Sequence, residues 1–179
     1  MNAIAVAGPV SGRQLHKFGG SSLADVKCYL RVAGIMAEYS QPGDMMVVSA
    51  AGSTTNQLIN WLKLSQSDRL SAHQVQQTLR RYHSDLISGL LPPESAEPLI
   101  AEFIQDLERL AVLLDGKADE VCYAEVVGHG EIWSARLMAA VLNHLDMQAA
   151  WLDARDFLRA ERAAQPQVDE GLSFPLLQQ

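Results

Sequence analysis

Apolar residues along this chain alternate between short solid runs and helix-spaced stripes. A short extended-looking run at 14–16 precedes a helical pattern over residues 24–39, which stops at the Gln-Pro-Gly turn 41–43. Residues 45–48 (Met-Met-Val-Val) then form a solid apolar run without alternation. Such a run, bounded by turn residues, is typical of a strand buried in a parallel sheet. The order predicts a strand–helix–strand unit at the start of the chain.

The next patterns are mainly helical. Residues 56–62 turn helical after a loop of small residues, and apolar stripes over 71–91 and 94–115 predict two long helices whose apolar faces belong to the core. Two prolines at 92–93 separate these helices. Because proline cannot continue a helix, and because the connection is short, the pair favours an antiparallel hairpin.

Glycine and a further apolar run mark the last predicted elements. Residues 119–127 have a helical pattern, and 128–131 (Gly-His-Gly-Glu) predict a glycine loop between helices. A helix over 133–145 and a third strand over 148–152 follow. After that strand the pattern weakens.

Strands that alternate with helices predict an α/β fold with a mainly parallel sheet and right-handed crossovers. In such sheets, ligands bind beyond the carboxyl ends of the strands. The loops that follow the first two predicted strands are therefore the expected ligand site. The glycine loop at 128–131 lies between helices, so this rule does not place it at the site.

Composition limits the classes of function. The 179 residues suggest one domain with a substantial core, and 48% hydrophobic with 20% charged residues is ordinary for a globular protein. The net charge of −7 and the absence of a basic stripe disfavour a nucleic-acid partner.

No apolar stretch has the length of a membrane span, and the N-terminus lacks a basic region typical of a signal peptide. Cys28 and Cys122 indicate buried thiols in a reducing compartment, so we expect a cytoplasmic protein.

Residues 17–22 (Lys-Phe-Gly-Gly-Ser-Ser) join the first strand to the first helix. Gly19 and Gly20 let the backbone approach a ligand closely, and a following helix directs its free N–H groups to the same place. Lys17 adds a positive charge, so the junction favours a polyphosphate. The same residues are also consistent with a tight turn beside a surface lysine.

Two other segments carry candidate chemistry. Ser49 and Thr55 lie in the small-residue loop after the second strand, where their hydroxyls suit a polar ligand or, alternatively, serve as turn and helix-capping groups. Glu131 follows a glycine, and its carboxylate suits an ammonium group or, alternatively, stabilises a helix N-terminus. His129 is consistent with a locally hydrogen-bonded histidine.

Together the blocks at 17–22, 49–56 and 129–131 resemble the amino-terminal part of aspartate kinase, in the amino acid kinase superfamily. The resemblance runs from Arg13 to Gln179 and leaves residues 1–12 as an N-terminal tail. It implies a three-layer αβα sandwich with a mainly parallel sheet, of the amino acid kinase or carbamate kinase type, and residues 13–179 as an incomplete N-terminal lobe of the catalytic domain. It also implies phosphoryl transfer from MgATP to the β-carboxylate of L-aspartate, which gives 4-phospho-L-aspartate.

The resemblance assigns the ATP side to the first block. Lys17 matches the family lysine that contacts the ATP phosphates and is the candidate catalytic residue. Gly19, Gly20 and Ser21 match the loop whose backbone amides surround those phosphates. Phosphoryl transfer depends on charge neutralisation and positioning more than on covalent catalysis. A lysine and backbone N–H groups directed at the phosphates supply the charge neutralisation.

On the aspartate side, Ser49 and Thr55 match hydroxyl residues of the substrate pocket, and Glu131 matches the acid that holds the α-ammonium group. No residue of this chain is implied as a metal ligand. His129 is not in the catalytic set, because the nucleophile is a carboxylate that is already ionised. A gap-free match places Pro166 where several family members have an arginine that clamps a substrate carboxylate; Arg159 or Arg162 are the alternatives.

The family's other parts are expected outside this chain: the half that binds the rest of ATP and Mg²⁺, the regulatory ACT domains and a homoserine dehydrogenase domain that uses NADP. The family also implies a homo-oligomeric parent. Two other hypotheses stay open. One is a non-catalytic fragment that only binds a ligand or a partner chain, and the other is an amino acid kinase for a different substrate.

Overall fold

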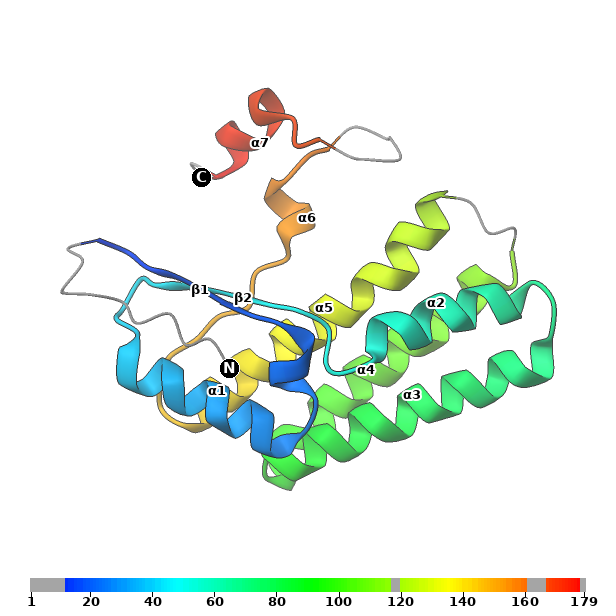
Figure 1. Cartoon of the computed structure of the whole chain (residues 1–179), viewed down its shortest axis with the longest axis horizontal. Coiled ribbons are helices and arrows are strands. Elements are labelled where there is room, and N and C mark those ends of the chain that lie inside the picture. The colour runs from blue at the N-terminus through cyan, green and yellow to red at the C-terminus, as the bar shows by residue number, and fades with distance from the viewer. Residues whose placement is uncertain (1–11, 117–119, 161–166, 178–179) are drawn as a thin grey trace.

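The computed structural model describes residues 12–116, 120–160 and 167–177. Its elements, in chain order, are β1 (Leu15–Phe18), a 3₁₀ turn η1 (Gly20–Leu23), α1 (Val26–Tyr39), β2 (Met45–Val48), α2 (Thr54–Ser65), α3 (Arg69–Leu90), α4 (Pro93–Leu114), α5 (Glu120–His144), α6 (Ala154–Phe157) and α7 (Glu170–Leu177) (Figure 1). The α/β class is confirmed: a small parallel sheet lies among helices. Most of the expected N-terminal tail, residues 1–11, lies outside the described part.

The sheet in the described residues consists of β1 and β2, which pair in parallel with Leu15 opposite Met45 and Phe18 opposite Val48. Side chains alternate between two faces, as the pleat of a strand requires. Phe18 and Val48 are on the face that packs against the core. Met45 and Val47, 52% and 45% exposed, are on the other face. The solid apolar run therefore correctly predicts a parallel strand, but one buried on a single face.

The predicted hairpin is confirmed, because α3 and α4 pack against each other on either side of the link Leu91–Pro92. Pro93 stands at the first position of α4, where a missing N–H leaves no helix bond unmade. Asp68 caps α3 by accepting hydrogen bonds from the amides of Leu70 and Ser71, each 3.1 Å long.

The predicted glycine loop at 128–131 is wrong. Residues 120–144 form one continuous helix, α5, which passes through Gly128 and Gly130. The reason is tertiary packing: Gly130 lies against Ala50, and a Cβ at Gly130 would be 2.8 Å from the Cβ of Ala50. Glycine disfavours a helix interior by about 1 kcal/mol relative to alanine, and close packing of this kind outweighs that preference.

The third predicted strand, at 148–152, is also wrong, because no strand is formed there. The side chain of Asn143 binds both backbone groups of Ala149, accepting from its N–H at 2.8 Å and donating to its carbonyl at 2.7 Å. A strand would need those two groups for its ladder. The backbone also turns sharply, with positive φ at Asp146 and Gln148.

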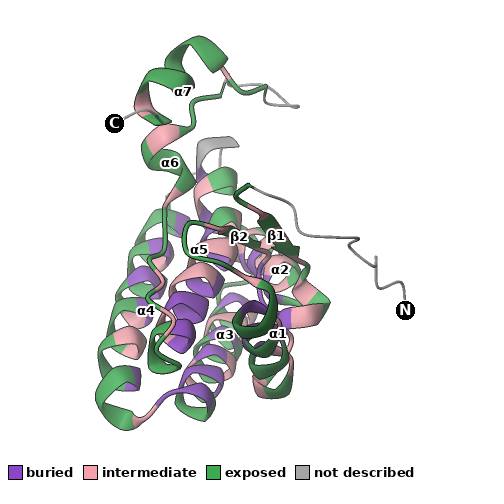
Figure 2. Ribbon diagram, turned by 90° about the vertical axis from the view of Figure 1, so that its left-hand side faces the viewer, coloured by how far each residue is buried: buried purple, intermediate pink, exposed green. Residues whose placement is uncertain are grey.

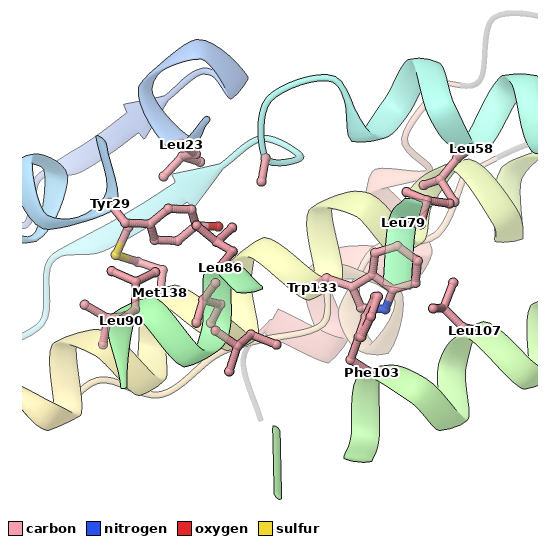
Figure 3. Close-up of a cluster of buried hydrophobic side chains, with 14 of the residues drawn as sticks. Leu23, Tyr29, Leu58, Leu79, Leu86, Leu90, Phe103, Leu107, Trp133 and Met138 are labelled. Atoms are coloured by element: carbon pink, nitrogen blue, oxygen red, sulfur yellow. The ribbon is translucent and has the colours of Figure 1, made fainter. Parts of the chain in front are cut away.

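One continuous core joins the sheet to the helices (Figure 2). Leu23 and Tyr29 pack near Met138 beneath the sheet, whereas Leu58 and Leu79 lie near Trp133 among the helices (Figure 3). The apolar stripes predicted for residues 71–91 and 94–115 contribute to this core, as expected. In the described part of the chain, no helix is both long and apolar enough to cross a membrane.

Candidate active site

The loops after β1 and β2 lie side by side at the same edge of the sheet. The Ser49 amide donates to the Phe18 carbonyl and the Gly52 amide to the Gly20 carbonyl, both at 3.0 Å. Gly20 is required at this contact, because a Cβ there would lie 2.7 Å from the carbonyl oxygen of Ala50. The two predicted ligand loops are thus joined through their backbones.

On the β1 side, Lys17 is exposed, and among the described residues its ammonium group makes no ion pair. Gly19 has an extended backbone (φ −80°, ψ 167°) and precedes η1, whose residues begin with Gly20 and Ser21. The helix after the glycines is therefore a single 3₁₀ turn. The N-terminus of α1 is separate and is capped by Asp25, which accepts from the Cys28 amide at 2.8 Å.

Hydrogen bonds hold the pKa of Asp25 below its usual value, led by the one from the Cys28 backbone. The carboxylate at the start of α1 is therefore ionised and satisfies the amides of that helix end. The expectation that the following helix directs its free N–H groups at Lys17 and Gly19 is not met by α1, which begins at Val26. Any anion at Lys17 would depend on the loop amides and on the lysine charge.

On the β2 side, α5 brings Glu131 to the loop, where its Oε1 accepts a hydrogen bond from the Ala50 amide at 3.3 Å across 81 residues of sequence. Ser49 and Thr55 are half-buried, and within the described structure neither hydroxyl makes a hydrogen bond. The N-terminus of α2 at Ser53 has no side-chain cap bond. The capping alternative for these hydroxyls therefore lacks support. Ser49 precedes Ala50, which binds Glu131, and Thr55 lies in the first turn of α2.

Sequence reasoning missed the two residues that shape this loop. Thr54 is fully buried, and its hydroxyl donates to the Ala51 carbonyl at 2.6 Å and lies 3.1 Å from Nε2 of His83. Because the hydroxyl proton is already used, His83 is the donor of the second bond. The helical spacing that connects Leu79, His83 and Leu86 is the one signal that indicates burial of the histidine.

Burial lowers the pKa of His83 to about 3. Below pH 6.5, His83 is therefore protonated in the unfolded chain but stays neutral in the folded chain. The free energy of unfolding then falls by about 1.4 kcal/mol per pH unit until pH 3. Lowering the pH from 6.5 to 5 should reduce the free energy of unfolding by about 2 kcal/mol. His83→Gln, which does not titrate, should lack this component when wild type and variant are unfolded in urea at both pH values. Equal pH dependence of the two proteins would contradict it.

The helices α4 and α5 also share a polar cluster around Asp106. The carboxylate of Asp106 accepts from Arg136 at 2.7 Å, from Trp133 at 3.1 Å and from Arg109 at 3.0 Å. His129 is fully buried, with Nδ1 2.5 Å from the Glu125 carbonyl and Nε2 2.7 Å from the Arg109 guanidinium. The histidine is thus locally hydrogen-bonded, as one interpretation of the sequence held.

Among the described contacts, the guanidinium of Arg159, one of the two arginine alternatives, makes its hydrogen bonds within its own segment, to backbone carbonyls that include those of Arg155 and Leu158. Arg162 and Pro166 lie outside the described residues. The described residues contain no group of three or more His, Cys, Asp or Glu side chains that could hold a metal ion.

Residues 12–178 match the amino acid kinase family. The chain is 80% identical over its whole length to the bifunctional aspartokinase/homoserine dehydrogenase 2 of Escherichia coli, of which it covers 22%. It is 28% identical over 87% of its length to the chloroplastic bifunctional aspartokinase/homoserine dehydrogenase 1 of Arabidopsis thaliana, of which it covers 18%. The chain thus spans about a fifth of the length of these curated relatives.

Solved structures agree on the fold. Aspartokinase III of Escherichia coli in complex with aspartate and ADP superposes with a TM-score of 0.82 and 24% identity, over 93% of this chain and 37% of that one. The same enzyme in complex with lysine and aspartate gives a TM-score of 0.81. With the family match over residues 12–178, these findings show that the chain belongs to the amino acid kinase family.

Proposed function

We propose that this chain forms the aspartate-binding part of an aspartate kinase, which transfers the γ-phosphoryl group of MgATP to the β-carboxylate of L-aspartate. One observation carries the proposal: the carboxylate of Glu131 lies at the loop after β2, bonded to the Ala50 amide, and this loop is joined to the Gly20 loop. An acid and a glycine-rich loop at one sheet edge suit a substrate with an ammonium group and a polyphosphate donor.

The proposed roles follow from charge. Lys17 and the amides of the loop at 19–21 neutralise the ATP phosphates, because charge on the transferring group must be stabilised. Glu131 pairs with the α-ammonium group of aspartate, and the hydroxyls of Ser49 and Thr55 donate to its carboxylates. These contacts would orient the β-carboxylate toward the phosphoryl group, which is the positioning that this reaction requires.

Magnesium is proposed to arrive with ATP. Mg²⁺ is commonly held by substrate phosphates with only one or two protein carboxylates, and the described residues offer no multi-ligand cage. The ion would neutralise phosphate charge. Within this chain, the groups that share that role are the Lys17 ammonium and the loop amides.

The 80% identity to a bifunctional relative supports a wider proposal for the whole protein. Residues 13–179 would be the N-terminal portion of an aspartokinase domain in a homo-oligomeric, cytoplasmic enzyme. A homoserine dehydrogenase domain that uses NADP would lie in another part of that enzyme.

The direct test is ATP-dependent formation of aspartyl hydroxamate by the full-length product of this gene. Hydroxylamine traps 4-phospho-L-aspartate as aspartyl hydroxamate, so formation of the hydroxamate should require ATP, Mg²⁺ and L-aspartate together. Glutamate and acetylglutamate serve as substrate controls. Activity with one of these in place of aspartate would contradict the proposed substrate. Binding of aspartate without turnover would favour the alternative of a non-catalytic ligand-binding chain.

Replacing Glu131 by glutamine should raise the Michaelis constant for aspartate far more than that for ATP. The substitution keeps the shape and removes the charge that would pair with the α-ammonium group, and this pairing contributes mainly to substrate binding. A charged hydrogen bond of this kind is worth about 1.5–3 kcal/mol, so an increase of roughly 10- to 100-fold is expected. Equal changes of the two constants in steady-state kinetics would assign Glu131 a structural role.

A further inference from the structure

Two neighbouring residues of α3, Tyr82 and His83, make hydrogen bonds next to the loops after β1 and β2. Neither belongs to the motifs that suggested a function. The rings are 5.0 Å apart and edge-on to each other, which fixes them as one unit. His83 is further packed against the rings of Phe103 and Trp133, with centroids 4.9 and 5.1 Å away.

His83 holds the loop after β2. It is buried, donates to the Thr54 hydroxyl at 3.1 Å, and Thr54 donates in turn to the Ala51 carbonyl at 2.6 Å. Ala51 is next to Ala50, whose amide binds Glu131. A buried chain of hydrogen-bonded polar groups has little freedom, because breaking one of its bonds leaves a polar atom unsatisfied.

Tyr82 holds the loop after β1. Its hydroxyl donates to the Ala24 carbonyl at 3.0 Å, directly after η1, which begins at Gly20. The same hydroxyl approaches Gly52, where an added Cβ would lie 3.0 Å from it. Gly52 belongs to the loop after β2 and has φ +54°, so that loop turns through the left-handed region at the point where it passes the tyrosine.

We infer that Tyr82 and His83 are positioning residues, which set the loop after β1 and the loop after β2 in the arrangement that lets one bind the phosphates and the other bind aspartate. The inference rests on the proposed function. It assigns Tyr82 to the phosphate side through Ala24, and His83 to the aspartate side through Thr54. Neither side chain touches the substrate.

The test compares Thr54→Val with Thr78→Val in the full-length gene product. Thr78 is on the exposed side of α3, and its hydroxyl also donates to a backbone carbonyl, that of Gln74 at 2.9 Å, so it is a matched control. Thr54→Val should raise the Michaelis constant for aspartate about tenfold, the effect of one lost buried hydrogen bond, with little change for ATP. Thr54→Ser should restore the wild-type Michaelis constant for aspartate, and Thr78→Val should leave this constant unchanged.

Tyr82→Phe tests the other side. It removes a single hydroxyl, and it should raise the Michaelis constant for ATP more than that for aspartate. A merely structural role would lower the fraction of folded enzyme, which reduces apparent turnover and leaves both constants unchanged. That result, or equal changes of both constants in Thr54→Val and Tyr82→Phe, would overturn the inference.

Hydrogen exchange separates this inference from the proposed function, because it needs no turnover. In Thr54→Val the amides of residues 50–55 should exchange faster, whereas in Thr78→Val they should not. If the wild type fails to phosphorylate aspartate, the proposed function fails, and exchange still decides whether α3 holds the loop. Unchanged exchange in Thr54→Val would overturn the positioning role even in an active enzyme.

Discussion

Replacing Lys17 by alanine should lower the turnover of aspartate phosphorylation on the order of 10²–10³-fold, because a preorganised positive group at a transferring phosphoryl is typically worth about 3–4 kcal/mol. Lys17 lies at the end of β1, directly before the glycine loop. Its side chain is exposed and makes no ion pair with any described residue, so the fold should persist. The measurement is the turnover number at saturating ATP and aspartate, per mole of folded enzyme.

Two further variants make this result specific. Lys17→Arg keeps the charge and should retain more activity than alanine. Lys63→Ala removes another exposed lysine, in the last turn of α2, and should have no effect. Near-normal turnover of Lys17→Ala would contradict the assignment and favour the alternative of a surface lysine beside a tight turn.

Replacing Gly130 by alanine should displace α5 from the loop after β2 and impair aspartate use by about 100-fold. The new Cβ would lie 2.8 Å from the Cβ of Ala50 and 3.3 Å from Cγ2 of Thr54, so one of the two elements has to move. Overpacking of this kind costs about 1–3 kcal/mol of stability. The next residue is Glu131, and a shift of about 1 Å in a substrate-positioning group can cost about 100-fold in rate.

Gly128→Ala is the matched control for this prediction. Gly128 is in the same helix, two residues earlier, and an added Cβ would have no neighbour within 4 Å. Alanine should therefore stabilise α5 by about 1 kcal/mol without changing kinetics. Equal kinetics and thermal stability for Gly128→Ala and Gly130→Ala would contradict the proposed contact between α5 and the loop.

Local patterns were enough to predict the first half of the fold. The solid run 45–48 matches β2 residue for residue, and the helical stripe over 24–39 contains α1. The α1 stripe has helical periodicity, and the β2 run is recognised by its unbroken apolar character between turn residues. The loop predicted at 128–131 was wrong because Gly130 packs against Ala50, a residue far away in sequence, and no local pattern reveals that contact.

The candidate site, like the fold, could be predicted only in part from the sequence. Gly20 and Glu131 could be proposed from the sequence because both stand in short recognisable blocks. The structure shows the hydrogen bonds of Gly20 to Gly52 and of Glu131 to Ala50, and a site role for these residues stays a prediction. Thr54 and His83 were missed because their bond joins residues 29 positions apart. A buried histidine on an apolar stripe is visible in the sequence, but its partner is fixed only when α2 and α3 pack together.

The connections between elements bear on the order in which the chain folds. α3 and α4 are joined by two residues, so their contacts close small loops and should form early. β1 and β2 meet across 30 residues, as in the bond from the Gln14 amide to Asp44, and Glu131 meets Ala50 across 81. Loop-closure entropy delays such contacts. We therefore expect the helical hairpin to form first and the loops after β1 and β2 to assemble last, on a surface that the hairpin already provides.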